Sequence, residues 1–334
     1  MQKKLIILTT AFGSNFSGGS RATCEVINRI QNEFSQIIVL GTQLGNHEIN
    51  SLQFIKVKNW FHAYRQVKQL DSEISIYYGD FYNAFILAVA KVKYAFTYHD
   101  NWPELSGLNT KHFLQNLFYF PLYKQIFKHA RKLITVSQFK QKQLKRYHKK
   151  VELIPNGFTA HNAENLQWKK PMEKPRKVLM VGNIDQRKYA KALPLFEKLA
   201  QAVDFEVDIY GHIIDRQLAN KLTRFPFVNF KGFIRNIPFN SYRVLLHTSF
   251  TESFGMVFCE AIFNGVPVLA FEGSGASELV VEQNGTLVPK NEPHVLQERL
   301  KQMVNKPFLT NPVSVKNYSW AVSSDGYRRL FQDV

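Results

Sequence analysis

The chain is predicted to be an α/β protein with two doubly wound domains, each built on a mostly parallel sheet. Three observations lead to this prediction. Short apolar runs alternate with helix-length segments along most of the sequence. One polar, proline-containing stretch near the middle interrupts this alternation, which then begins again. The length of 334 residues is enough for two domains of roughly 150 residues each.

The first domain is expected to span residues 1–158. It begins with a strand, a glycine-rich turn and a helix within residues 3–34. The segments that continue the alternation are QIIVLGT (36–42), EISIYYGD (73–80), YNAFILAVAK (82–91), YAFTYHD (94–100), HFLQNLFYFPLYKQIFKHA (112–130) and KLITVS (132–137). In the long helix candidate at 112–130, Pro121 is expected to bend or break the helix, and the aromatic side chains are expected to be core.

A linker is expected at 159–175, because the stretch there is polar and contains prolines. The second domain is expected at 176–317. Its alternating segments are KVLMVGNI (177–184), AKALPLFEKLAQAV (190–203), FEVDIYGH (205–212), DRQLANKLTRF (215–225), VNFKGF (228–233), RVLLHTS (243–249) and VPVLAF (266–271). Residues 318–334 have apolar side chains at helical spacing, and this C-terminal helix is expected to pack back on the first domain.

The composition excludes several classes of protein. No run of 18 apolar residues is present, so no membrane-spanning helix is expected, and the apolar run LIIL near the N-terminus is too short for a signal peptide. The two cysteines, Cys24 and Cys259, lack metal-ligand spacing and fit a reducing cytoplasm. No D-x-D sequence occurs, and no metal site is expected.

The positive charge is concentrated in the first half of the chain. The net charge is +17, and residues 1–150 hold 21 Lys and Arg against 8 Asp and Glu. Between Lys111 and Lys150 there are eleven basic residues and no acidic one. The segment SQFKQKQLKRYHKK (137–150), with Lys140, Lys142, Lys145 and Arg146, is expected to be mostly a solvated helix face. This asymmetry indicates either an ordinary solvated basic surface or an anionic partner, which would be a membrane surface, a nucleic acid or an anionic polymer.

Two acids bracket a predicted helix start in the second domain. Glu252 precedes Ser253-Phe254-Gly255, and Glu260 lies inside the apolar run that follows. Helix N-termini at the carboxyl ends of parallel strands bind anions such as a diphosphate. Carboxylates on either side of such a site would accept hydrogen bonds from the hydroxyls of a sugar and of a ribose. The alternative is that Glu252 caps the helix and Glu260 lies on its wet face.

Glu252 and Glu260 match the E-x7-E motif of the GT-B glycosyltransferases, and TESFGMVFCEAIFNGVPVLAF is similar to the signature of glycosyltransferase family 4. Other segments resemble the same family in the same order, so the resemblance covers nearly the whole chain. These are the loop with Gly18, Gly19 and Arg21, and the segments TYHD (97–100), TVSQF (135–139), LIPNGF (153–158) and VGNIDQRKY (181–189). The resemblance implies a GT-B fold, in which two Rossmann-like domains face each other across a cleft.

The resemblance also implies roles for individual residues. His99, Glu252 and Lys188 are the expected catalytic residues, with His99 contacting the donor sugar. The expected donor-binding residues are Gly18, Gly19, Arg21, Arg187, Ser253, Phe254, Gly255, Met256, Val257 and Glu260. Ser274, Gly275 and Glu278 form a further loop that either meets the nucleotide or is only structural. The chain departs from the family pattern at Asn183, where an arginine is common, and Arg187 is expected to supply the missing charge.

The implied function is transfer of a hexose or N-acetylhexosamine, with retention of anomeric configuration, from a nucleoside-diphosphate sugar. A UDP-sugar is the expected donor, with no other cofactor and no metal. The expected acceptor is a cell-envelope glycan, a lipid-linked glycan or a teichoic-acid-type polymer, and the expected location is the cytoplasm, peripherally on the inner face of the cell membrane. The alternatives are a GT-B sugar-nucleotide epimerase, a basic nucleic-acid-binding protein, which lacks a recognisable motif here, and an inactive homologue acting as a partner subunit.

Overall fold

The computed structural model describes residues 3–16, 18–159, 174–200, 203–290, 292–306 and 310–334. Most of the linker expected at 159–175 therefore lies outside the described residues. The chain divides into two units, one of Met1–Gly157 with Tyr318–Val334 and one of Phe158–Asn317, and each is described by itself below.

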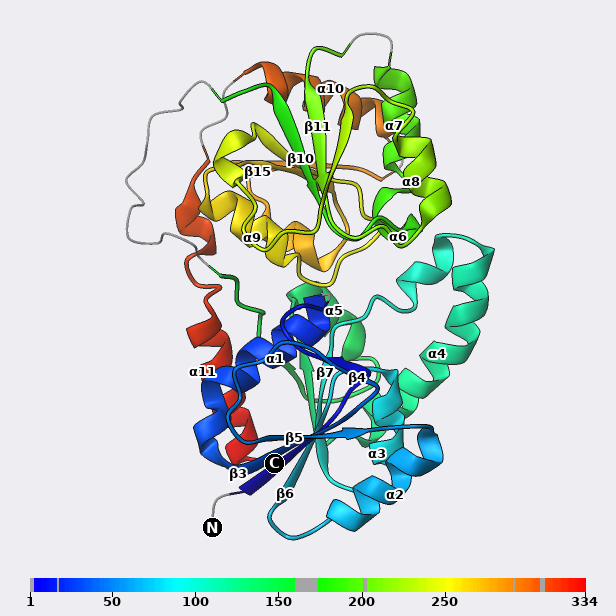
Figure 1. Cartoon of the computed structure of the whole chain (residues 1–334), viewed down its shortest axis with the longest axis vertical. Coiled ribbons are helices and arrows are strands. Elements are labelled where there is room, and N and C mark those ends of the chain that lie inside the picture. Colours follow the sequence, from blue (N-terminus) through cyan, green and yellow to red (C-terminus); the bar gives the residue numbers. More distant parts are fainter. Residues whose placement is uncertain (1–2, 17, 160–173, 201–202, 291, 307–309) are drawn as a thin grey trace. The chain divides into compact units, whose positions relative to one another are not determined.

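The first unit is built on a seven-stranded parallel sheet in the order β5-β3-β1-β6-β7-β8-β9 (Figure 1). The strands are β1 (Lys3–Leu8), β3 (Phe34–Gly41), β5 (Leu52–Lys56), β6 (Ser75–Gly79), β7 (Tyr94–Tyr98), β8 (Lys132–Thr135) and β9 (Val151–Leu153). A separate two-stranded sheet pairs β2 (Ala11–Phe12) with β4 (Gln43–Leu44). The central strand β1 pairs with β3 on one side and β6 on the other, and its apolar residues are fully buried because helices cover both faces.

Helices cover the two faces of this sheet. They are α1 (Gly18–Ile30), α2 (Trp60–Leu70), α3 (Phe85–Val89), α4 (Thr110–His129), α5 (Gln138–Leu144) and α11 (Trp320–Gln332). Buried side chains of α2, α3, α4 and α5 join one core cluster with the sheet. On the other side α11 lies along α1 (Figure 1). The α11 rings of Tyr327 and Phe331 pack on Tyr78 of β6, which anchors the C-terminal helix to this unit.

Helix α4 bears on two expectations. Pro121 does not break the helix, which is continuous over 20 residues, and the buried Tyr123, Ile126 and Phe127 pack its C-terminal part on the sheet. The aromatic side chains are fully buried only in this second half of the helix, and Tyr119 and Phe120 pack against the core while partly exposed. In the first half, Phe113 and other apolar side chains are exposed.

Lys140 was expected on the solvated face of its segment, and this is wrong. Its side chain is fully buried, because Lys140 and Leu144 lie one helical turn apart on the face of α5 that packs on the sheet. Lys140 Nζ donates to Glu104 Oε2 at 2.9 Å and lies 5.7 Å from the centre of the Tyr98 ring. The ion pair and the aromatic ring compensate the charge for its loss of water.

The second unit is built on a six-stranded parallel sheet in the order β12-β11-β10-β13-β14-β15. Its strands are β10 (Lys177–Val181), β11 (Glu206–Tyr210), β12 (Val228–Gly232), β13 (Val244–His247), β14 (Val268–Phe271) and β15 (Gly285–Val288). Its helices are α6 (Gln186–Tyr189), α7 (Ala192–Leu199), α8 (Arg216–Leu222), α9 (Met256–Phe263) and α10 (Pro293–Asn305). Helices α7, α8 and α10 share one core cluster with the sheet.

In each sheet the chain order reverses beside the first strand of the unit. In the first unit β3 and β5 lie on one side of β1, and the later strands β6 to β9 lie on the other side. In the second unit β11 and β12 lie on one side of β10, and β13 to β15 on the other. The switch therefore lies between β1 and β6 and between β10 and β13. Connections that leave neighbouring strands in opposite directions open a crevice at their carboxyl ends. These two positions are where ligand-binding residues are expected.

Candidate active site

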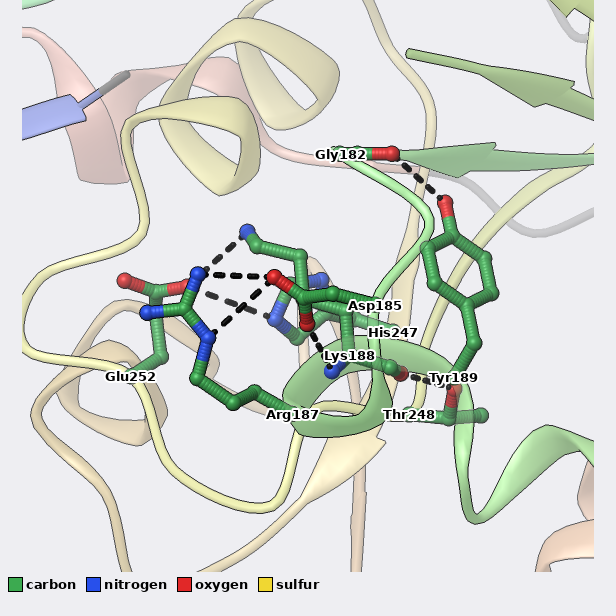
Figure 2. Close-up of polar contacts among 8 residues, drawn as sticks. All are labelled: Gly182, Asp185, Arg187, Lys188, Tyr189, His247, Thr248 and Glu252. Carbon is green, nitrogen blue, oxygen red and sulfur yellow. Dashed lines mark hydrogen bonds and ion pairs between the residues drawn. The ribbon is translucent and has the colours of Figure 1, made fainter. Parts of the chain in front are cut away.

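The candidate site of the second unit forms at the carboxyl ends of β10 and β13. Strand β10 is followed by Gly182 and then by the short helix α6, which carries Lys188. Strand β13 ends at His247, and the loop after it carries Glu252 and leads into α9. Figure 2 shows that side chains from these two connections point toward one another.

The position of Lys188 depends on two features of its connection. Asp185 caps α6, since its Oδ1 accepts a hydrogen bond from the backbone N–H of Lys188 at 3.1 Å. Gly182 has a φ of +140°, and a Cβ at this residue would lie 2.5 Å from Cδ of Lys188. Glycine is therefore required both for the turn after β10 and for the path of the lysine side chain.

Hydrogen bonds join α6 to the loop after β13. Thr248 Oγ1 donates to the carbonyl oxygen of Lys188 at 2.7 Å, and the N–H of Phe250 donates to the carbonyl oxygen of Arg187 at 2.8 Å. These bonds satisfy two carbonyl groups of the short helix. They also fix the two connections relative to each other, and Lys188 Nζ donates to Glu252 Oε2 at 3.3 Å (Figure 2).

The charges of this group follow from burial and from the neighbours. Burial raises the pKa of Glu252, but Lys188 and the backbone N–H of Ser253 outweigh it, so the pKa lies below its ordinary value and the carboxylate is ionised. Burial and the nearby Lys188 lower the pKa of His247 to about 3, so its imidazole is neutral. His247 Nε2 lies 3.7 Å from Glu252 Oε2, and its ring packs edge-on against Phe258.

Helix α9 begins beside Glu252. Gly255 precedes it with a φ of +82°, and a Cβ there would lie 2.8 Å from the Cβ of Ala276, so a larger residue would push this turn apart. Gly255, the residue at the N-cap position, has no side chain that could cap the helix, and the backbone N–H groups of the first turn carry the positive end of the helix dipole. Met256, Val257 and Glu260 share its partly exposed face, one turn apart, whereas the rest of the helix is buried.

Other predicted residues take more limited places. The side chains of Ser253 and Phe254 are buried, so a ligand at this turn would meet the backbone rather than these side chains. The backbone N–H of Gly275 donates to the carbonyl oxygen of Glu252 at 2.8 Å, which brings the loop of Ser274 and Gly275 against the site. In the same loop the Ser274 hydroxyl forms a capping box with Ser277.

Arg187 was expected to replace the charge missing at Asn183. The structure pairs its guanidinium with Asp185 Oδ2 at 2.7 Å (Figure 2). The positive charge of Arg187 is therefore partly compensated within its own helix, because the capping residue of α6 also serves as its counter-ion. Asn183 lies two residues after β10, and Lys188 Nζ donates to Glu252.

The predicted residues of the first unit lie at its own switch point. Gly18 and Gly19 form the first turn of α1 rather than a loop, because the strand-to-helix connection ends before them. A Cβ at Gly19 would lie 3.1 Å from Cβ of His99, which follows β7, so the structure brings these two residues together. Burial lowers the pKa of His99 to about 4. Arg21 lies on the same turn of α1 and is partly exposed.

Comparison with known proteins identifies the family. A family model described as Glycosyltransferase Family 4 matches residues 33–161, and one described as Glycosyl transferases group 1 matches residues 162–319. The two matches follow each other along most of the chain. The chain belongs to glycosyltransferase family 4. Members of this family are retaining, metal-independent GT-B enzymes that use nucleotide sugars.

Solved structures of known proteins share the fold of this chain. The Anabaena protein Alr3699/HepE, in complex with UDP and glucose, aligns with a TM-score of 0.75 at 18% identity, covering 99% of this chain and 100% of that one. WaaG, a glycosyltransferase involved in lipopolysaccharide biosynthesis, aligns with a TM-score of 0.73 at 16% identity, covering 97% of this chain and 95% of WaaG. At these identities the likeness concerns the fold, and it confirms the predicted GT-B architecture.

A curated relative is similar over part of its sequence. It is the UDP-N-acetylglucosamine–peptide N-acetylglucosaminyltransferase GtfA subunit of Streptococcus pneumoniae serotype 4, 25% identical over 163 residues, or 46% of this chain and 31% of that protein. The matched regions span about a third of the length of the curated relatives. These partial matches do not identify the donor or the acceptor of this chain.

Three residues of the family 4 sites were not singled out from the sequence. Asp185 was visible as a polar residue before a helix, a capping signal. His247 lies at the end of β13 and Asp80 directly after β6, and both strands lie beside a switch point. A polar residue at the end of a buried strand was the sequence signal that could have identified them. Asp80 is buried at the end of β6, accepts a hydrogen bond from Thr23 of α1 at 2.7 Å, and burial raises its pKa to about 7.

Proposed function

We propose that this chain transfers a hexose or N-acetylhexosamine from a UDP-sugar, with retention, to a cell-envelope glycan, a lipid-linked glycan or a teichoic-acid-type acceptor. The observation that carries the proposal is the ion pair of Lys188 with Glu252 beside the N-terminus of α9. The cation and the N–H groups of the helix start are partners for a diphosphate, and the ionised carboxylate is a partner for sugar hydroxyls.

In the proposed reaction the bond between the anomeric carbon and the diphosphate oxygen breaks, and the diphosphate leaves with additional negative charge. Lys188 and the N–H groups at the start of α9 stabilise this charge, and both are fixed before the reaction by the contacts around Gly182 and Gly255. The acceptor oxygen bonds to the anomeric carbon, and its proton passes to the leaving phosphate. No protein general base is assigned.

The two acids have different proposed tasks. Glu252 accepts hydrogen bonds from the sugar, and Lys188 holds its carboxylate in place. Glu260 lies one turn along α9 on the same partly exposed face as Met256 and Val257, and it accepts hydrogen bonds from the ribose. Arg187 contributes less to the diphosphate, because Asp185 binds its guanidinium. The contact of His99 with the donor sugar stays a prediction.

The choice of donor and acceptor is supported by likeness. HepE is a structure with UDP and glucose, and the GtfA relative is named for UDP-N-acetylglucosamine, which favours a uridine nucleotide and either sugar class. WaaG acts in lipopolysaccharide biosynthesis, which favours an envelope acceptor. The excess of positive charge in residues 1–150 favours work at an anionic membrane surface. No helix among the described residues has the length and hydropathy to cross a membrane.

A thermal-shift screen tests the donor. UDP-, GDP- and ADP-sugars are added one at a time, and a ligand at 100 times its dissociation constant stabilises the folded chain by about 2.7 kcal/mol. We expect the largest shift with a UDP-hexose or UDP-N-acetylhexosamine, and a smaller shift with the same ligand for Glu260→Gln. Product analysis with the donor alone then follows. An epimerised sugar nucleotide would replace the transferase proposal with an epimerase.

A further inference from the structure

Helix α4 carries an exposed apolar stripe. Phe113, Leu114, Leu117 and Phe118 are between 51% and 60% exposed. Their spacing places them on one face of the helix, two pairs one turn apart. The opposite face of α4 packs on the sheet through its own apolar residues. The exposed stripe is therefore additional to what the core of the first unit requires.

A second helix extends this stripe. Trp60 and Phe61, at the start of α2, are 45% and 63% exposed. The ring of Trp60 stacks on Phe118 of α4, with centroids 6.1 Å apart, and packs edge-on against Phe85 of α3 at 4.7 Å. Two segments about fifty residues apart in sequence thus form one surface, seen with α2, α3 and α4 grouped in Figure 1. We call it the α2–α4 surface, and it consists of Trp60, Phe61, Phe113, Leu114, Leu117 and Phe118.

The charged side chains of the helices that form the α2–α4 surface are all positive. Helices α2, α3 and α4 contain no aspartate or glutamate. Arg65 of α2 lies over the ring of Phe61 at 4.3 Å. Lys111, Lys124 and Lys128 are exposed on α4, the last two along the continuation of its apolar stripe. On these helices the large apolar side chains are thus flanked by cations.

We propose that the α2–α4 surface binds an anionic lipid bilayer, with its aromatic and leucine side chains in the interface and its cations on the phosphates. Helices that lie in a membrane interface combine these features, apolar and aromatic residues on one face with lysine and arginine beside them. This inference rests on the proposed function, because an acceptor in the cell envelope or linked to a lipid requires the enzyme to bind at a membrane. It also locates membrane binding on α2 and α4 rather than on Lys140, which is buried.

Co-sedimentation of the whole chain with vesicles tests the proposal. The vesicles are phosphatidylcholine alone, or phosphatidylcholine with phosphatidylglycerol, at two salt concentrations. Leu114→Ser with Leu117→Ser removes apolar surface, and its matched control is Ile214→Ser with Val322→Ser, at side chains that are exposed elsewhere. Lys124→Gln with Lys128→Gln removes charge, and its matched control is Lys306→Gln with Lys316→Gln. All four variants change exposed side chains, so folding is expected to persist.

We expect wild type to prefer the anionic vesicles and to lose binding as salt rises. The leucine double variant should lower the partition constant by about tenfold or more, because two buried side chains are lost from the interface. The lysine double variant should lower it on anionic vesicles alone, and both controls should match wild type. Emission of Trp60, compared with Trp60→Phe, should shift to shorter wavelength when anionic vesicles are added.

Three results would overturn the proposal. The first is that the wild-type chain binds none of the vesicles. The second is that the leucine double variant binds vesicles as well as wild type. The third is that wild type is a dimer in analytical ultracentrifugation and that the leucine double variant is a monomer. The last would assign the surface to a second copy of the chain. Donor binding measured without vesicles separates this inference from the proposed function, because the leucine variant should keep the wild-type thermal shift with the UDP-sugar.

Discussion

Replacing Lys188 by methionine tests the leaving-group role most directly, because methionine keeps much of the side-chain volume and removes the charge. The side chain passes Gly182 and reaches Glu252 Oε2 at 3.3 Å. If Lys188 stabilises the departing diphosphate, its loss should lower kcat/KM by about 100- to 1000-fold, or about 3 to 4 kcal/mol of transition-state stabilisation. Lys191→Met, an exposed lysine next along the chain, should stay within about twofold of wild type.

The ion pair adds a second effect. At 3.3 Å, with an effective dielectric constant near 20, the attraction between Lys188 and Glu252 is about 5 kcal/mol, and it is reduced by solvent because the two side chains are 29% and 23% exposed. Without this attraction, burial dominates and the pKa of Glu252 rises. The activity that remains in the methionine variant should therefore increase with pH over a higher range than in wild type.

The assay measures release of UDP from the donor found by the screen, with calorimetric titration of UDP as a separate measure of binding. We expect UDP affinity to fall by about tenfold and kcat to account for the remainder, since charge on the diphosphate grows as the bond breaks. A methionine variant with kcat/KM within about threefold of wild type would refute the role of Lys188. A variant that loses UDP affinity alone would limit that role to binding.

Four further predictions concern other parts of the molecule. Glu260→Ala should weaken donor binding with little change in kcat, whereas Glu252→Ala should also lower kcat; equal and wild-type kinetics in both would contradict the site. Transfer activity should persist in excess EDTA, and a loss restored by magnesium or manganese would count against a metal-independent reaction. Lys140→Ala should lower the free energy of unfolding in urea by about 3 kcal/mol, because it leaves Glu104 without its buried partner, while Lys142→Ala should change it by less than about 0.5 kcal/mol. Asp80→Asn should melt at a higher temperature than wild type, and this difference should grow from pH 4 to pH 7. Burial raises the pKa of Asp80 in the folded chain to about 7 from 3.8, so ionisation of Asp80 over this range favours the unfolded wild-type chain. A difference in melting temperature that does not change with pH would contradict this account.

The sequence by itself determined the α/β class, the two-domain organisation as a prediction, and the family. Apolar strands that alternate with helices specify parallel sheets, because each strand must be buried on both faces. The spacing of Glu252 and Glu260 around a helix start specified a candidate ligand site before any coordinates were known. These features are local in sequence, and local patterns are sufficient to find them.

The tertiary structure decided which of the candidate side chains meet. The pairing of Lys188 with Glu252 joins residues 64 positions apart and depends on the order of β10 and β13 in the sheet. The burial of Lys140 depends on the position of Glu104 on another element, and the exposure of Leu114 and Leu117 depends on which face of α4 meets the sheet. From composition alone, the basic segment 137–150 was expected to be solvated along most of its length. Burial and charge pairing are properties of contacts between distant segments, and only the folded chain brings those segments together.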